Sequence, residues 1–296
     1  MHHRPSPRPR PPATRPLLGF GAVLGAILAT LTALLAAPAQ ARGAGDAIGV
    51  PRTHTGLAHP ERDWLGSSVA AHEGRSTGGD SVTAAASSVP RTPGFDVSNW
   101  QGKVDWNAAY KKGARFAYIK ATEGTTYKDP TFNANYTNSY YAGFIRGAYH
   151  FARPDSSGGK AQADYFVSHG GGWSKDGKTL PPLLDIEYPE GAACYGLSQS
   201  QMRGWISAFL TEVHAKTTRW ATIYTTTAWW KKCTGNTSLY SANHPLFIAR
   251  YASTPGTLPG WPFYSFWQHA DSGTFPGDQD YFNGPISGLR NLANNE

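Results

Sequence analysis

The feature that most constrains the fold is an alternation, from residue 93 onward, of short apolar runs with segments of helical pattern. Apolar runs of this length are typical of strands buried on both faces of a sheet. We expect seven such strands, at Gly94–Ser98, Arg115–Ala121, Arg146–Phe151, Pro182–Glu187, Trp220–Tyr224, Leu246–Tyr251 and Phe263–Gln268.

Helical patterns fill several of the intervals between these runs. The clearest extends from Ser198 to Lys216, where Ser198 and Gln201 match a capping box and apolar residues recur on one face. Further helices are expected at Asp105–Lys112, Thr131–Gly143 and Lys160–His169. The strand-helix order predicts an α/β fold in which crossover helices join parallel strands. Seven or eight strands in about 200 residues predict a compact (β/α) barrel.

The first 41 residues have the pattern of a secretory signal peptide. A basic, Pro-rich stretch, Met1 to Pro16, leads into the apolar segment Leu17–Ala37, and Ala39-Gln40-Ala41 matches a cleavage site. The rival interpretation is an uncleaved membrane anchor, because 21 largely apolar residues can span a bilayer. Both place the rest of the chain outside the cytoplasm, and we expect a secreted, extracellular protein with no membrane contact after cleavage.

Residues 42–92 are rich in Gly, Ser, Ala and Thr and have no sustained hydrophobic period. This composition indicates a flexible linker or a propiece, and we assign it no chemistry. The rest of the chain, residues 93–296, is then one folded domain.

The net charge of +7 does not indicate a nucleic-acid partner. Residues 1–41 contain four Arg and no acid, whereas residues 93–296 contain 18 basic and 15 acidic residues, without a run of Lys or Arg. The chain also has no H-E-x-x-H, G-x-S-x-G or Walker motif, so we expect no metal and no organic cofactor.

Cys194 and Cys233 are the two cysteines of the chain. In an exported protein such a pair most often forms a disulfide, which we expect here. A catalytic thiol is the weaker alternative, because neither cysteine has the sequence context of a thiol enzyme.

Four acids stand at or just after predicted strand ends: Asp96, Asp185, Glu187 and Asp278. Asp185 and Glu187 are two residues apart on an extended backbone, so their side chains point to the same face. Close carboxyl groups in an apolar setting have pKa values that are driven apart, with one group protonated and the other ionised. A glycosidase needs such a pair, to protonate the leaving oxygen and to stabilise positive charge at the anomeric carbon.

Each of these acids also has a structural interpretation, because an Asp at a strand end more often caps a turn and a lone D-x-E is a weak signal. The combination is more specific, since it joins four strand-end acids, an exported chain and 38 aromatic residues, more than a core requires. We therefore favour a glycosidase.

Five motifs resemble one family in the same order along the chain. They are GFDVSNWQGKVDW, FAYIKATEGTTYKDPTFNANY, GAYHFARP, LPPLLDIE and DQDYFNG, and they are similar to the Chalaropsis-type lysozymes of glycoside hydrolase family 25. The resemblance implies a flattened, irregular TIM-like barrel and a muramidase that cleaves the β-1,4 bond between N-acetylmuramic acid and N-acetylglucosamine. By motif position, Glu187 corresponds to the general acid/base and Asp185 to its partner. Asp96 and Asp278 correspond to the other two acids of the site.

One motif departs from the family, which commonly has D-x-N-x-F where this chain has Asp278 to Phe282. An acid, Asp280, thus replaces the usual Asn, although the register favours Asp278 as the functional acid. The resemblance implies retention with assistance from the substrate's 2-acetamido group, and inversion with Asp96 or Asp278 as base is the competing mechanism. A chitinase-like hydrolase and a non-catalytic glycan-binding barrel are the alternative functions.

Four aromatic residues at predicted strand ends are candidates for sugar contacts, although each is equally suited to packing at the barrel mouth: Tyr149, Tyr224, Tyr251 and Trp267. Lys120 and Glu123 are suited either to an ion-pair network or to contacts with the peptide stem. We expect a monomer whose partner is the glycan strand of peptidoglycan.

Overall fold

A computed structural model describes residues 57, 59–75 and 90–296 of the chain. The expected signal peptide, residues 1–41, lies outside the described residues. Within the described part, no helix combines the length and the apolarity needed to cross a membrane.

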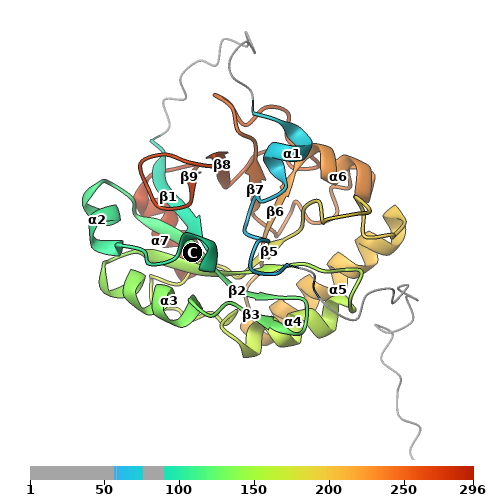
Figure 1. Ribbon diagram of the computed structural model, residues 1–296, viewed down its shortest axis with the longest axis horizontal. Coiled ribbons are helices and arrows are strands. Elements are labelled where there is room, and N and C mark those ends of the chain that lie inside the picture. The colour runs from blue at the N-terminus through green and yellow to red at the C-terminus, as the bar shows by residue number, and fades with distance from the viewer. Residues whose placement is uncertain (1–56, 58, 76–89) are drawn as a thin grey trace, which may run out of the picture. The chain divides into compact units, whose positions relative to one another are not determined.

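Eight strands form a closed barrel in the order β1-β9-β8-β7-β6-β5-β4-β2, because β1 also pairs with β2, and β3 adds a short antiparallel pairing at β2 (Figure 1). The strands are β1 (Thr92–Val97), β2 (Phe116–Glu123), β3 (Tyr127–Lys128), β4 (Ile145–Phe151), β5 (Leu183–Asp185), β6 (Thr222–Thr226), β7 (Leu246–Ala249), β8 (Phe266–Ala270) and β9 (Asp278–Phe282). The predicted (β/α) barrel is therefore confirmed.

The barrel is irregular at β9, which the strand pattern did not predict. β9 is antiparallel to both of its neighbours, β8 and β1, whereas the other barrel pairs are parallel. Only residues 271–277 separate β8 from β9. A connection this short can join antiparallel strands but not parallel ones, which need a crossover of a dozen or more residues.

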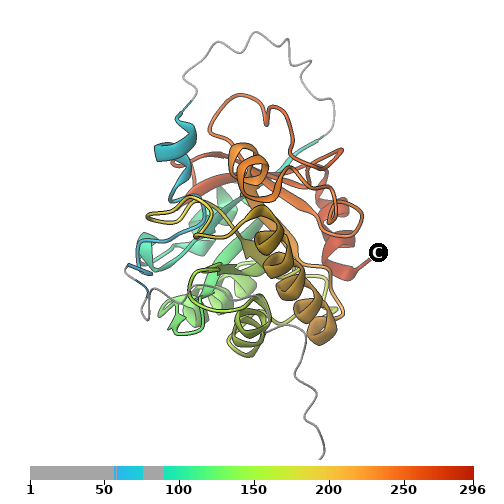
Figure 2. The ribbon, with the colours of Figure 1, turned by 90° about the vertical axis from the view of Figure 1, so that its right-hand side faces the viewer.

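The helices are α1 (Val69–Glu73), α2 (Trp106–Lys111), α3 (Phe132–Tyr141), α4 (Gly159–Ser168), α5 (Gln199–Thr217), α6 (Thr227–Thr234) and α7 (Ile286–Asn294), with a 3-10 turn at Asn99–Gln101. The four predicted helices correspond to α2, α3, α4 and α5. The capping box is present, since Ser198 accepts from the Gln201 amide and the Gln201 side chain accepts from the Ser198 amide. Figure 2 shows α5 alongside α4 on the outside of the strands.

The strands separate two apolar layers. One fills the barrel and includes Phe116, Tyr118 and Phe266, and the other lies between the strands and the helices and includes Ala117, Ile119 and Trp267. Side chains alternate between these layers because successive residues of a strand point to opposite faces. This alternation decides which strand-end residues reach the barrel interior.

The expected disulfide is present between Cys194 and Cys233, whose Cα atoms are 5.3 Å apart. It ties the loop before α5 to α6 across a sequence separation of 39 residues. In the chain-entropy account, closing a loop of this length stabilises the fold by about 4 kcal/mol.

Candidate active site

The four predicted acids meet at one end of the barrel. Asp96 lies on β1 opposite Asp278 of β9, Asp185 ends β5, and Glu187 follows two residues later. Because β9 is antiparallel, its first residue lies at the edge where the parallel strands end. All four acids are almost completely buried, with at most 2% of Asp278 exposed.

Gln268, on β8, connects the acids to the tyrosines of the site. Its Nε2 donates to Asp96 Oδ2 at 2.8 Å and to Asp278 Oδ2 at 3.1 Å, and its Oε1 accepts from the Tyr224 hydroxyl at 2.6 Å. The amide thus lies between two carboxyl groups that would otherwise repel each other. Gln268 was not among the predicted site residues, although it ends a predicted strand two residues after the inward-facing Phe266.

Asp280 is also buried in the barrel. It lies two residues further along β9 than Asp278, and therefore further from the end of the barrel where the four acids meet. It is opposite Gly94 in the register, and neither of its carboxyl oxygens has a hydrogen-bond partner among the described residues. Burial raises the pKa of Asp280 well above its ordinary value, and the nearby Asp278 raises it further. Asp278 rather than Asp280 accepts hydrogen bonds from the Gln268 and Tyr251 side chains.

Asp185 and Glu187 face the same side, as predicted from their spacing. Burial raises the pKa of Asp185 well above its ordinary value, Glu187 raises it further, and Lys120 opposes the shift. Burial also raises the pKa of Glu187 from 4.5 to about 7, against hydrogen bonds from Ser68 and Gly66. A carboxyl group with a pKa near neutrality can both donate and accept a proton.

Lys120 and Glu123 form a buried ion pair beside these acids. Lys120 Nζ lies 2.7 Å from Glu123 Oε2, and Arg153 Nη1 lies 3.2 Å from Glu123 Oε1. The ion-pair interpretation of the two residues is therefore confirmed. Across residues 57, 59–75 and 90–296, no cluster of three or more His, Cys, Asp or Glu side chains is placed to hold a metal.

Three of the four predicted aromatic residues reach the site through their hydroxyl groups. Tyr251 donates to Asp278 at 3.3 Å, Tyr224 donates to Gln268, and the Tyr149 oxygen accepts from the Leu65 amide at 3.1 Å. Each has little or no exposed surface, with 6% of Tyr251 the largest share. They are placed for hydrogen bonding more than for stacking on an open sugar face.

Trp267, the fourth, is not brought to the site. Its indole lies in the layer between the strands and the helices and donates to the Arg250 carbonyl at 2.9 Å. The cause is strand alternation, because the neighbouring Gln268 points into the barrel and Trp267 must point out of it.

Part of the segment expected to be a linker or propiece also contacts the acids. We call residues 59–75 the strap. Gly66 donates its amide to Glu187 Oε1 at 2.7 Å, and Ser68 donates its amide to Glu187 Oε2 at 3.2 Å. The sequence contains no signal for this contact, because the strap has no period and Glu187 is about 120 residues away.

The raised pKa of Glu187 predicts that its contribution to stability is lost as the pH rises from about 4.5 to about 7. A folded-state pKa of about 7 against 4.5 means that the folded chain binds this proton more tightly than the unfolded chain in that window, so the contribution falls as the pH rises. Burial lowers the pKa of His150 to about 3 and of His244 and His269 to about 4, so these residues add stability as the pH rises over the same window. The free energy of unfolding of the wild type, relative to that of Glu187→Gln, should therefore fall by about 2 kcal/mol from about pH 5 to pH 7.

Chemical denaturation at several pH values measures this loss, and Glu187→Gln is the control that removes the titrating group. The wild type should lose stability relative to the variant between about pH 5 and pH 7, and the two should run parallel above about pH 8. The same pH dependence in both proteins between about pH 5 and pH 7 would contradict the assignment of the raised pKa to Glu187.

Comparison with known proteins gives one consistent family. The sequence profile described as Glycosyl hydrolases family 25 matches residues 95–278. "N,O-diacetylmuramidase" of Chalaropsis sp is 49% identical over 207 residues, which cover 68% of this chain and 98% of that protein. The solved structure of a muramidase from Acremonium alcalophilum is 59% identical with a TM-score of 0.68, and the match covers 69% of this chain and 99% of that one.

A further relative is similar over more of the chain. "Lysozyme M1" of Streptomyces globisporus is 45% identical over 280 residues, which cover 92% of this chain and 94% of that protein. Residues 93–296 make up only about 69% of the chain, the share matched by the Acremonium muramidase. The similarity to lysozyme M1 therefore extends well into the residues that precede the barrel.

Proposed function

The chain belongs to glycosyl hydrolases family 25, and from this premise we propose which of its buried acids carry out the reaction and by what stereochemical course. The predicted family and the predicted activity are confirmed. The protein is a muramidase that hydrolyses the β-1,4 bond between N-acetylmuramic acid and N-acetylglucosamine in peptidoglycan.

Glu187 is the proton donor of this proposal. Its pKa of about 7 leaves the carboxyl group protonated in a useful fraction of molecules near neutral pH. In the first step its proton passes to the glycosidic oxygen as the bond from that oxygen to the anomeric carbon breaks, and the electron pair of the bond stays on the oxygen.

Asp185 supports the nucleophile, which belongs to the substrate. The observation that carries this proposal is that both carboxyl oxygens of Asp185 are buried beside Glu187, and apart from the Glu187 carboxyl group no donor among the described residues reaches them. A buried acceptor without a donor is costly, and the N–H of the 2-acetamido group would satisfy it. The acetamido oxygen then attacks the anomeric carbon, and Asp185 stabilises the positive charge of the cyclic oxazolinium intermediate.

Water completes the cycle from the face that the leaving group has vacated. The Glu187 carboxylate takes a proton from water, the water oxygen bonds to the anomeric carbon, and the bond to the acetamido oxygen breaks. Two displacements at one carbon give net retention. Substrate-assisted enzymes of this kind are recognised exceptions to the scheme with two enzyme carboxylates.

Asp96 and Asp278 complete the electrostatic environment. Burial raises the pKa of Asp96 well above its ordinary value, Asp280 and Asp278 raise it further, and the Gln268 amide opposes the shift. Gln268 is a positioning residue that holds these two acids and the Tyr224 and Tyr251 hydroxyls in one network. Tyr149, Tyr224 and Tyr251 are placed to hydrogen-bond the sugar or the intermediate.

The anomer formed first tests the stereochemical course. Time-resolved proton NMR of a soluble peptidoglycan fragment, begun within the lifetime of the unmutarotated product, should show the β-anomer of the new reducing end before the α-anomer. An initial α-anomer would exclude retention and would favour a mechanism with Asp96 or Asp278 as base.

The site of action follows from the substrate, since peptidoglycan lies outside the cytoplasm. We further propose that residues 1–41 are a cleaved signal peptide and that the secreted enzyme works as a monomer on glycan strands. The basic and apolar pattern of the first 41 residues and the Ala39-Gln40-Ala41 site support the first of these statements.

A further inference from the structure

Both oxygens of the proposed proton donor are occupied by the chain itself. Glu187 Oε1 accepts from the Gly66 amide at 2.7 Å, and Oε2 accepts from the Ser68 amide at 3.2 Å and from the Ser68 hydroxyl. These three donors oppose the rise in the pKa of Glu187 that burial causes, and they leave neither oxygen free to meet a substrate. The same donors occupy the space through which a glycosidic oxygen would reach Glu187.

The strap also binds the opposite side of the site. The Leu65 carbonyl accepts from Gln268 Nε2 at 2.9 Å, and the Gly66 carbonyl accepts from the Tyr251 hydroxyl at 3.2 Å. Leu65 and Val69 are completely buried and belong to the apolar layer that fills the barrel. The strap therefore lies inside the site rather than over it, and a sugar ring and the strap cannot be bound there at once.

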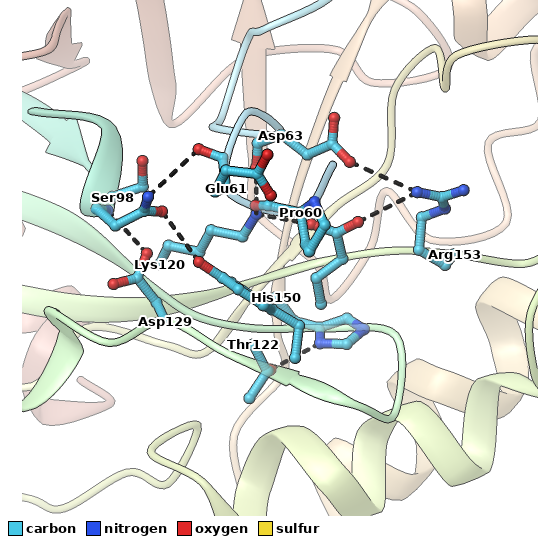
Figure 3. Close-up of polar contacts among 12 residues, drawn as sticks. Pro60, Glu61, Asp63, Ser98, Lys120, Thr122, Asp129, His150 and Arg153 are labelled. Carbon is cyan, nitrogen blue, oxygen red and sulfur yellow. Dashed lines mark hydrogen bonds and ion pairs between the residues drawn. The ribbon is translucent and has the colours of Figure 1, made fainter. Parts of the chain in front are cut away.

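Contacts beside the site hold the two ends of the strap. The carbonyls of Pro60 and Asp63 accept from Lys120 Nζ, the former at 2.8 Å, and the Asp63 carboxyl group lies 3.5 Å from Arg153 Nη1 (Figure 3). Further contacts are a stacked pair of Trp64 and Trp100, a stacked pair of His72 and Tyr188, and an ion pair of Arg75 with Asp271. Figure 2 shows the strap, in blue, beside the yellow loop that follows β5.

We propose that the strap is an inhibitory pro-segment, so that the enzyme is made in an inactive form and hydrolysis of a peptide bond between Arg75 and Thr92 activates it. This inference rests on the proposed role of Glu187. It also agrees with the similarities above. The match to the Acremonium muramidase covers almost all of that chain but only 69% of this one, which is about the share that residues 93–296 make up.

The position of the strap in the chain explains why a single cleavage is sufficient. The strap precedes the barrel, and residues 76–91 join the two. An endopeptidase adds water across one peptide bond of this join: the water oxygen bonds to the carbonyl carbon, the carbon–nitrogen bond breaks, and the released amine keeps a proton. The strap is then a separate peptide, and its effective concentration falls from about the millimolar range of a tethered segment to that of free solute.

The first experiment compares the two forms of the full exported chain. A recognition sequence for a site-specific endopeptidase replaces residues 80–86, and the release of reducing ends from purified peptidoglycan is measured before and after cleavage and removal of the strap. We expect the rate to rise about tenfold or more, and Glu187→Gln to stay inactive in both forms.

The outcomes separate the two proposals. Equal activity before and after cleavage overturns the pro-segment and leaves the role of Glu187 intact. A cleaved Glu187→Gln chain that is as active as the cleaved wild type overturns the role of Glu187, and the inference that rests on it.

A second experiment displaces the strap without cleavage. Gly66 has φ +90°, and a Cβ at this residue would lie 2.6 Å from the Tyr251 hydroxyl oxygen and 2.8 Å from that of Tyr224. Gly66→Ala should therefore push the strap out of the site and raise the rate of the uncleaved chain severalfold. It should not change the rate after cleavage, because Gly66 leaves with the strap.

Gly74→Ala is the matched control for this substitution. Gly74 also lies in the strap with a positive φ, +72°, but nothing is within 4 Å of the position of its Cβ. The two variants thus carry a similar backbone penalty, and only Gly66→Ala adds the clash. An uncleaved Gly66→Ala chain that is no faster than uncleaved Gly74→Ala overturns the proposal.

Discussion

Replacing Glu187 with Gln lowers kcat on peptidoglycan by about a thousandfold, because the amide cannot donate a proton to the leaving oxygen or take one from water. The substitution preserves size and the capacity to accept a hydrogen bond. The barrel should therefore remain folded. The apolar surroundings of residue 187, which raise the pKa of the Glu187 carboxyl group in the wild type, should be unchanged. Each variant is compared as the cleaved chain, with initial rates of reducing-end release and circular dichroism as the measurements.

Glu190→Gln is the matched control for this variant. Glu190 is exposed, follows the same strand by a few residues, and takes part in none of the contacts of the site described above. It should keep kcat within about twofold of the wild type, as surface substitutions usually do. Mass spectrometry of the products adds a second readout: reducing-end muramic acid should come from the wild type and from Glu190→Gln, but not from Glu187→Gln. Undiminished activity of Glu187→Gln would exclude it as the acid.

Replacing Asp185 with Asn lowers kcat by about a hundredfold or more, since the variant loses the negative charge that stabilises the oxazolinium intermediate. The measurement that separates this role from a structural one uses two substrates. One is a muramyl oligosaccharide with a normal 2-acetamido group. The other carries a methyl group on the acetamido nitrogen, which removes the N–H and leaves the attacking carbonyl oxygen.

The two changes should not be additive, because the methyl group removes the hydrogen bond and Asn removes the charge that strengthens it, so both weaken the same interaction. With the methylated substrate, Asp185→Asn should cost much less activity than with the normal one. Asp164→Asn, on the outer helix α4 and paired with Lys160 and Lys216, is the control and should not distinguish the substrates. Losses that simply multiply would show that Asp185 does not act through the acetamido group.

The pattern of the sequence was sufficient to predict most of the barrel. Buried strands are recognisable because they are short and continuously apolar, and α5 is recognisable because its capping box and its apolar face coincide. The fifth and the last predicted runs were less well bounded: Trp220 and Phe263 lie outside the strands and are 38% and 61% exposed. β9 was missed as a strand because two of its five residues are acids.

The candidate site was predictable to the extent that strand alternation governs it. Asp185 and Glu187 share a face because they are two residues apart, a consequence of backbone geometry alone. The same rule, applied one residue further along β8, separates Gln268 from Trp267. The aromatic composition favoured the Trp267 ring as the site residue. Because Phe266 points into the barrel, Gln268 two residues later also points inward, and its side-chain amide lies at the acids.

The sequence by itself determined the barrel, the strand-end acids and the disulfide, because each depends on local pattern or on pairing of the chain's two cysteines. Only the tertiary structure decided that Gln268 links Asp96 to Asp278 and that the strap enters the site. Those contacts join residues that are ten to more than 200 positions apart. The strap has no pattern of its own, and backbone amides and carbonyls, which every residue carries, make most of its contacts with the acids and tyrosines.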